Sequence, residues 1–413
     1  MLVAIRSCWA LLLGIALIML GNGLQGTLLG LRASLEGFTT TVTGLVMTSY
    51  YVGFLLGCTV VPKFLANVGH IRVFAALASI ASTAVLLHTE FVNPWAWGIF
   101  RLMTGFAYAG LYVVAESWLN DKATNSTRGQ LLSVYMVISF GGLGFGQLLL
   151  ILADPVETTL FILISVLISL ALVPISLTAS SAPEFSEPKH ISFPQLYQVS
   201  PLGVSGCFSV GVVHGALFGM GAVYANKMGM SVSQTSLFMF VFLLGGIVLQ
   251  WPVGRLSDSF GRRRIITTFT FLAMTSSMVA IFASTQSHAI LLWAVCLYGG
   301  MSLPLYSICV AYTNDHLSAE QMVAASSTLV LVRGLGSVVG PMAVAVLMGK
   351  FGANGIFWSL AVTHLVIGLL ALYRATQREA PPATEQPNYL MVGIKESPVV
   401  AAVSVKPAGK EQT

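Results

Sequence analysis

Hydrophobic residues in this chain come in long runs that are separated by short polar stretches. An α-helix of about 20 apolar residues crosses the hydrocarbon core of a bilayer. The pattern predicts twelve such helices, at approximately residues 9–31, 39–61, 72–89, 95–119, 129–153, 157–178, 200–224, 233–254, 264–284, 289–312, 321–348 and 354–375. Because most connections between these runs are very short, neighbouring helices are expected to be antiparallel.

One connection is long, and it divides the runs into two sets of six. Residues 179–199, ASSAPEFSEPKHISFPQLYQV, combine prolines, serines and charges, as linkers do. We therefore expect an N-terminal six-helix bundle at 1–178, a cytoplasmic linker at 179–199 and a C-terminal six-helix bundle at 200–376. Residues 377–413 are proline-rich and polar, which predicts a disordered cytoplasmic tail.

Composition agrees with a protein that lies in a membrane. Of the 413 residues, 56% are hydrophobic and 8% charged, and the mean hydropathy is +0.84. A soluble domain is about a quarter charged, so the sequence predicts an all-α integral membrane protein. The first apolar run lacks an A-x-A-like cleavage site and is interpreted as a retained helix. The five cysteines lie in or beside apolar runs without a CxxC pair, so we expect no disulfide framework, metal site or cofactor.

The positive charges predict the orientation of the chain. The net charge is +5, with a pI near 9.0. In a membrane chain the location of Lys and Arg matters more than their sum, so we expect no nucleic-acid partner. With the N-terminus in the cytoplasm, 15 of the 20 Lys and Arg fall on the cytoplasmic side; Arg32, Lys227 and Lys350 fall outside. This asymmetry predicts a multi-pass protein of the inner (plasma) membrane with both termini cytoplasmic.

The two halves of the sequence repeat each other. PKFLANVGHIR at 62–72 is followed 192 residues later by GRLSDSFGRRR at 254–264. GLG at 142–144 recurs at 334–336 with the same offset, and the pairs LY and ND recur with an offset of 194. Such an internal duplication is typical of transporters.

The second loop carries a resemblance to a known family. It matches the signature loop of the major facilitator superfamily, Gly-x-Leu-x-Asp-x-x-Gly-Arg-Arg/Lys-x, at Gly254, Leu256, Asp258, Gly261, Arg262 and Arg263. RLMTGFAYAG at 101–110 resembles the fourth-helix motif of proton-coupled members. FGGLGFG at 140–146 resembles the fifth-helix motif of antiporters, but lacks its Gly-Pro pair. ESWLN at 116–120 is similar to a bacterial branch whose substrates are poorly known.

The resemblance extends from about residue 9 to residue 376 and has functional implications. It implies two pseudo-symmetric six-helix bundles that move a small organic solute by alternating access. It also implies a monomer in the lipid bilayer, coupling to protons and a slight preference for efflux. The usual acidic proton carrier of the first helix is missing, because Asn22 and Gln25 stand there.

Asp258 predicts a conformational latch. Gly261 permits the tight connection, and a carboxylate at 258 can face the N–H groups at the start of the fifth helix, beside Arg128. This contact requires the cytoplasmic ends to be together, so it would hold the outward-facing state. The first copy has Pro62 and Ala66 in place of the glycine and the aspartate, which predicts no equivalent latch. Alternatively, the loop only anchors the topology through Arg262 and Arg263.

Charged residues at membrane depth need a partner or a water-filled cavity. Arg101, Tyr108, Tyr112 and Glu116 form a stripe about 80° wide, which we expect to face a central cavity. Arg101 could instead be held by backbone carbonyls. Glu116 could belong to the inner gate with Arg128 or carry a proton. Arg333 suits an anionic group of the substrate, Glu116, or local support of its helix.

Uncharged polar residues extend the list of candidates for the cavity. Asn22 and Gln25 lie on one helical face and could line the cavity or join helices. His214 could shuttle protons or be satisfied by a neighbour. The other candidates are Gln147, Tyr298 and Tyr306.

Two other classes of function compete with solute transport. Met220, Met228 and Met230 could bind Cu(I) in a metal importer, although methionine is also an ordinary apolar filler. The second competing class is a membrane sensor or enzyme built on the same scaffold. The sequence contains no HExxH, GxSxG or Walker motif, so we expect neither an enzyme nor an ATP-driven pump.

Overall fold

The computed structural model describes residues 2–122, 128–177 and 191–377, and this part of the chain is helical without strands. Most of the predicted linker and nearly all of the predicted tail lie outside the described residues. The elements are α1 (Leu2–Leu35), α2 (Thr40–Val68), α3 (His70–Glu90), α4 (Pro94–Lys122), α5 (Arg128–Leu148), η1 (Leu149–Leu152), α6 (Thr159–Ser176), α7 (Phe193–Val199), α8 (Pro201–Lys227), α9 (Val232–Phe260), α10 (Arg262–Ala283), α11 (His288–Ser302), α12 (Leu305–Asn314), α13 (Ala319–Phe351) and α14 (Gly355–Gln377).

Twelve spans in the described residues are long and apolar enough to cross a membrane, which confirms the predicted number. Two of them are composite: α5 continues into the 3₁₀ turn η1, and α11 and α12 together form the tenth span. The tenth was predicted as one helix, but it breaks before Pro304, which has no N–H group to continue the ladder. The end of the predicted linker forms the short helix α7, with Pro194 in its first turn.

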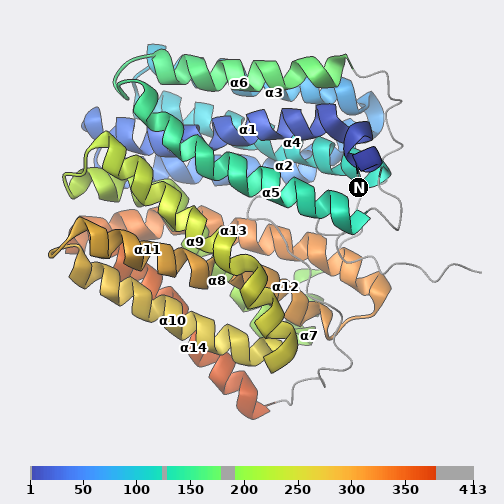
Figure 1. The fold of residues 1–413 in the computed structure, drawn as a ribbon, viewed down its shortest axis with the longest axis vertical. Helices are drawn as coiled ribbons and strands as arrows, with labels where there is room; N and C mark the ends of the chain where they lie inside the picture. Colours follow the sequence, from blue (N-terminus) through green and yellow to red (C-terminus); the bar gives the residue numbers. More distant parts are fainter. Residues whose placement is uncertain (1, 123–127, 178–190, 378–413) are drawn as a thin grey trace, which may run out of the picture.

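The helices are arranged in two bundles that lie side by side (Figure 1). The N-terminal half contains α1–α6, and the C-terminal half contains α8–α14. We call the end that carries the connections 36–39, 91–93, 228–231, 284–287 and 352–354 the loop face. The opposite end carries α7 and the α2–α3 and α9–α10 turns, and we call it the linker face.

The sequence duplication is also a structural one. Gly69 and Gly261 each join two helices with a positive φ, 89° and 86°, in equivalent turns of the two halves. Glycines also mark equivalent helix crossings. A Cβ on Gly105 would collide with the carbonyl of Tyr50, where α4 crosses α2. A Cβ on Gly299 would collide with the carbonyl of Phe242, where α11 crosses α9.

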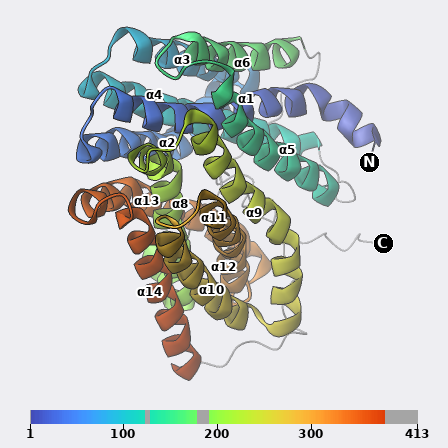
Figure 2. The ribbon, with the colours of Figure 1, turned by 60° about the vertical axis from the view of Figure 1, so that its left-hand side comes forward.

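The two halves meet close to the loop face. Thr48 of α2 donates a hydrogen bond to the carbonyl of Val338 in α13 (3.3 Å), and Ser236 of α9 donates to the carbonyl of Gln147 in α5 (2.8 Å). One hydrophobic core runs through both halves in this region. A second core, around Leu202 and Ile308, contains residues of the C-terminal half and lies nearer the linker face. From their shared contact, α5 and α9 diverge towards the linker face (Figure 2).

Candidate functional site

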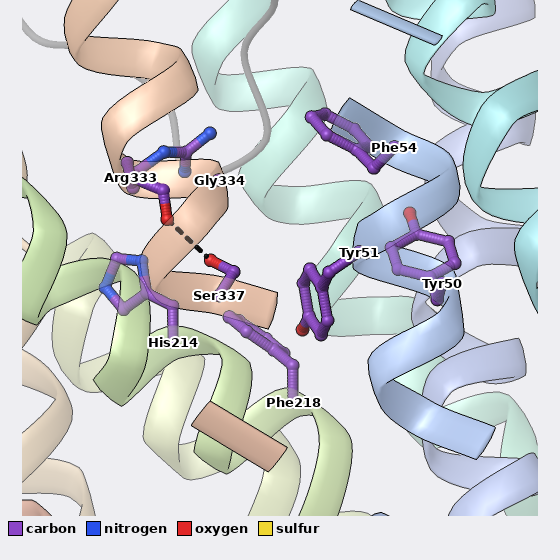
Figure 3. A pocket seen from close by; sticks show the side chains of 8 residues that line it. All are labelled: Tyr50, Tyr51, Phe54, His214, Phe218, Arg333, Gly334 and Ser337. Carbon is purple, nitrogen blue, oxygen red and sulfur yellow. Dashed lines mark hydrogen bonds between the residues drawn. The ribbon is translucent and has the colours of Figure 1, made fainter. Parts of the chain in front are cut away.

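A pocket with an empty volume of about 390 Å³ lies between the two halves. Three helices provide its walls, each through residues that share one helical face. Figure 3 shows the residues that line the pocket, which belong to α2, α8 and α13: Tyr50, Tyr51, Phe54, His214, Phe218, Arg333, Gly334 and Ser337. Its aromatic walls, with a few polar groups among them, are typical of a small-molecule site.

Arg333 brings a positive charge to this pocket. Its side chain is buried, and its guanidinium carbon lies 4.6 Å from the centroid of the Tyr306 ring. Its Nε atom has no hydrogen-bond partner, and none of the ion pairs among the described residues includes Arg333. The tyrosine face stabilises the cation without neutralising it, so the charge remains available to an anion.

Arg101 lies one layer behind the pocket wall. Its guanidinium carbon is 4.4 Å from the centroid of the Tyr50 ring, and the side chain is 4% exposed. Asn22 donates hydrogen bonds to the hydroxyls of Tyr50 (3.2 Å) and Tyr112. Tyr108 packs against the ring of Tyr50 at 6.4 Å. Tyr112 packs against the pocket-lining ring of Phe54 at 6.2 Å. Arg101, Tyr108 and Tyr112 of the predicted polar stripe therefore lie behind the rings of Tyr50 and Phe54 and do not line the pocket themselves.

Glu116 lies far along α4 from Arg101. It follows Arg101 by 15 residues of one helix, a distance of about 22 Å along the axis. The Tyr135 hydroxyl donates a hydrogen bond to its carboxylate (2.6 Å), and the side chain is fully buried. The side chain of Arg128 lies outside the described residues, so the predicted contact between Glu116 and Arg128 stays a prediction.

The remaining polar candidates occupy different places. His214 lines the pocket, and neither of its ring nitrogens has a partner among the described residues. Gln25 is buried in α1, and its amide atoms likewise have no partner in that part of the chain. Gln147 accepts a hydrogen bond from Thr27, which joins α5 to α1. Tyr298 stacks on Phe242 within the C-terminal half and does not line the pocket.

Of the residues that the sequence suggested for a cavity, Arg333 and His214 line this pocket, whereas the residues of its N-terminal wall were not among the candidates. Tyr50, Tyr51 and Phe54 come from SYYVGF at 49–54, where two adjacent tyrosines interrupt an apolar run. That pair was the available signal. Phe218 carried none, because an apolar residue in a span is ordinary.

The signature loop forms a charged cluster at the linker face. Arg262 is buried and donates hydrogen bonds to the carbonyl of Ala311 (2.9 Å) and to the carboxylate of Asp315, at the end of α12. It also pairs with Asp258 at 3.5 Å. Arg263 donates to the carbonyl of Arg374 (3.4 Å). These contacts tie α9, α10, α12 and α14 together.

The environment of Asp315 makes this cluster sensitive to pH. Burial raises the pKa of Asp315 from its usual 3.8 to about 6, although Arg262 opposes the shift. Asp258 is 38% exposed and lies one helical turn after Gly254. The carbonyl of Gly254 accepts a hydrogen bond from the Ser257 hydroxyl (2.7 Å). In this structure Asp258 therefore contacts Arg262 of its own half.

The N-terminal copy of this cluster is different. His70 stands 192 residues before Arg262, and its Nε2 lies 3.0 Å from the Ser117 hydroxyl. Ala66 stands 192 residues before Asp258. The arginine–aspartate pair of the second copy is thus not repeated in the first.

Twelve apolar spans in two repeated halves, with a buried pocket between them, define the class of protein. It is a polytopic transporter built of two pseudo-symmetric six-helix bundles. The family model described as Major Facilitator Superfamily matches residues 11–303 and 204–408. The chain belongs to the Major Facilitator Superfamily.

Similar proteins agree with this assignment. An uncharacterised MFS-type transporter, YcaD, of Escherichia fergusonii is 29% identical over 380 residues, which cover 92% of this chain and 98% of that protein. A solved structure of a mutant of the nucleoside transporter NupG has a TM-score of 0.75 at 12% identity and covers 89% of this chain and 99% of that one. A bacterial homologue of the human lysosomal transporter Spinster, in an inward-facing and occupied conformation, has a TM-score of 0.71 at 16% identity. The match covers 92% of this chain and 96% of that one. These relatives are transporters and not enzymes.

Proposed function

We propose that this protein is a secondary active transporter that moves a small organic solute by alternating access, with an anionic group of the solute held at Arg333. The observation that carries the proposal is the pocket between the halves, whose buried cation has no anionic partner among the described residues. A buried charge without a partner is costly, and an anionic solute would offset that cost.

The topology and the conformational state belong to the same proposal. We place both termini in the cytoplasm of a bacterial inner membrane, so that the linker face is cytoplasmic. The halves meet near the loop face and α5 and α9 diverge towards the linker face, which supports an inward-facing state. The 1–178 and 200–376 bundles would then rock about the pocket as a monomer.

Proton coupling and the direction of transport complete the proposal. His214 in the pocket and Glu116 with its Tyr135 partner are the candidate proton carriers. The glycine-rich α5 favours export by antiport. Copper import has less support, because Met220 and Met230 lie in the hydrophobic core and Met228 packs against it.

Transport into proteoliposomes tests the proposal. The assay applies concentration jumps of benzoate or salicylate, with neutral benzamide as the matched control, and records currents on a solid-supported membrane with and without a pH gradient. We expect currents for the carboxylates, none for benzamide, and larger currents when a pH gradient is imposed. The absence of currents and of uptake for every carboxylate, with folded protein, would contradict the proposal.

A further inference from the structure

A second cavity lies between α5 and α9, where the two halves part. Its empty volume is about 850 Å³. Two apolar stripes line it, one from each helix: Met136, Val137, Phe140, Gly141, Gly144 and Phe145 of α5, and Phe240, Leu244, Ile247 and Gln250 of α9. We call this cavity the α5–α9 groove.

The groove opens towards the surroundings at membrane depth. Val137 and Phe145 are 71% and 59% exposed, and Leu244 and Ile247 are 37% and 38% exposed. All four lie well inside their spans, Gln130–Leu152 and Val232–Phe260. An apolar opening in this position faces bilayer hydrocarbon, so its occupant must be apolar over the same length.

A glycine keeps the groove open. A Cβ built on Gly141 would meet no atom within 4 Å, so no helix contact requires glycine there. Gly141 stands 192 residues before Arg333 and is its counterpart in the sequence repeat. Where the C-terminal half places a guanidinium, the N-terminal half leaves a hollow.

The end of the groove that contains Gln250 leads towards the Arg333 site. Gln250 is buried at this end, and its amide donates a hydrogen bond to the hydroxyl of Ser307 at 3.0 Å. Ser307 directly follows Tyr306, and the guanidinium of Arg333 lies over the Tyr306 ring. An apolar groove therefore ends in polar side chains beside a buried cation.

We infer that the α5–α9 groove admits, from the bilayer, the hydrocarbon chain of a single-chain anionic amphiphile whose head group is bound at Arg333. The inference rests on the proposed function for its head-group site. The chain passes from lipid into an apolar groove and needs no exposure to water, while the anionic head meets the cation. Phosphate alone or a short carboxylate would use the head-group site without the groove.

Photolabelling in lipid nanodiscs tests this inference. The probe is dodecanoate with a diazirine at mid-chain, and labelled peptides are identified by mass spectrometry. We expect labels on 136–145 and 240–250. Unlabelled dodecanoate should compete, whereas acetate and dodecanol should compete weakly. Gly141→Leu should lower labelling about tenfold, because a side chain would fill the groove.

Gly349→Leu is the matched control, because a Cβ on Gly349 also meets nothing within 4 Å in a helix. Gly349 follows Arg333 by 16 residues of α13, about 24 Å along the axis. Labelling spread over the lipid-facing surface, or equal in both variants and wild type, would overturn the inference. Benzoate currents would persist in that case, so the proposed function would stand separately.

Discussion

At the scale of single residues, the pocket depends on how a buried cation is held. Arg333 and Arg101 lie over the rings of Tyr306 and Tyr50, at 4.6 and 4.4 Å from the ring centroids. A cation–π contact contributes about 0.5–2 kcal/mol, which lowers the cost of burial without cancelling the charge. Both cations are thus stabilised in place, and only Arg333 lines the pocket.

Replacement of Arg333 should therefore reduce affinity for anions specifically. Arg333→Gln removes the charge, and we expect about a tenfold or larger loss in the affinity for benzoate by calorimetry. Arg333→Lys keeps the charge but loses the planar stacking, so its affinity for benzoate should lie between those of wild type and Arg333→Gln. Lys350→Gln, an exposed charge on the same helix, is the control. Equal affinity in wild type and Arg333→Gln would remove Arg333 from the site.

Asp315 should give the protein a pH-dependent stability. Its pKa is about 6 when folded and 3.8 in its usual environment, so the folded state binds the proton more tightly. This contribution is complete below pH 3.8 and is lost as the pH rises through about 6. The melting temperature of Asp315→Asn should therefore fall less than that of wild type between those values.

The counterpart of Asp315 provides the control for this measurement. Asp121 stands 194 residues earlier and has a side chain that is 41% exposed. Asp121→Asn should keep the wild-type dependence on pH. If the melting temperatures of wild type and Asp315→Asn change with pH in the same way, the buried carboxyl of Asp315 does not contribute to the pH dependence of stability.

At the scale of helices, repeated glycine crossings set the packing within each half. Gly299→Ala would press a methyl group into the carbonyl of Phe242. We expect a destabilisation of about 1–3 kcal/mol, measured as a lower melting temperature in detergent. Gly349→Ala should instead be neutral or slightly stabilising, since its Cβ meets nothing and alanine favours helix. If the two variants melt alike, close approach at Gly299 is not what packs α11 on α9.

The sequence predicted the helices better than the site. Span number followed from the apolar runs, because hydrocarbon thickness sets their length. The break at Pro304 was missed, since the apolar run continues through it. Arg333 and His214 stood out as polar residues in apolar spans. Tyr50 and Phe54 could not be chosen, because the packing of one half on the other decides which residues of α2 face the pocket.

At the scale of the whole molecule, contact between the halves is confined mainly to the region near the loop face. A rocking motion must break these contacts and make others at the linker face. Asp258 contacts Arg262 of its own half here, at 3.5 Å. We expect the predicted contact between Asp258 and the start of α5 to form only in the opposite, linker-face-closed state.

Removal of this carboxylate should shift the equilibrium between the two states. A carboxylate at a helix N-terminus contributes about 1 kcal/mol, so Asp258→Asn should depopulate the linker-face-closed state roughly fivefold and slow transport. Ala66→Ser, at the equivalent place of the first copy, should change neither. An unchanged population and rate in Asp258→Asn would reduce the loop to a topology anchor.

Distances between the halves test the rocking of the two bundles most directly. Spin labels at Leu35 and Ser233 report on the loop face, and labels at Asn67 and Ser259 report on the linker face; all four positions are exposed. The measurement uses a background without the five native cysteines. In liposomes, a short loop-face distance should accompany a long linker-face distance in one population, with the reverse in the other. A single fixed distance at both faces in a transporting protein, or changes of the same sign at both, would contradict the account.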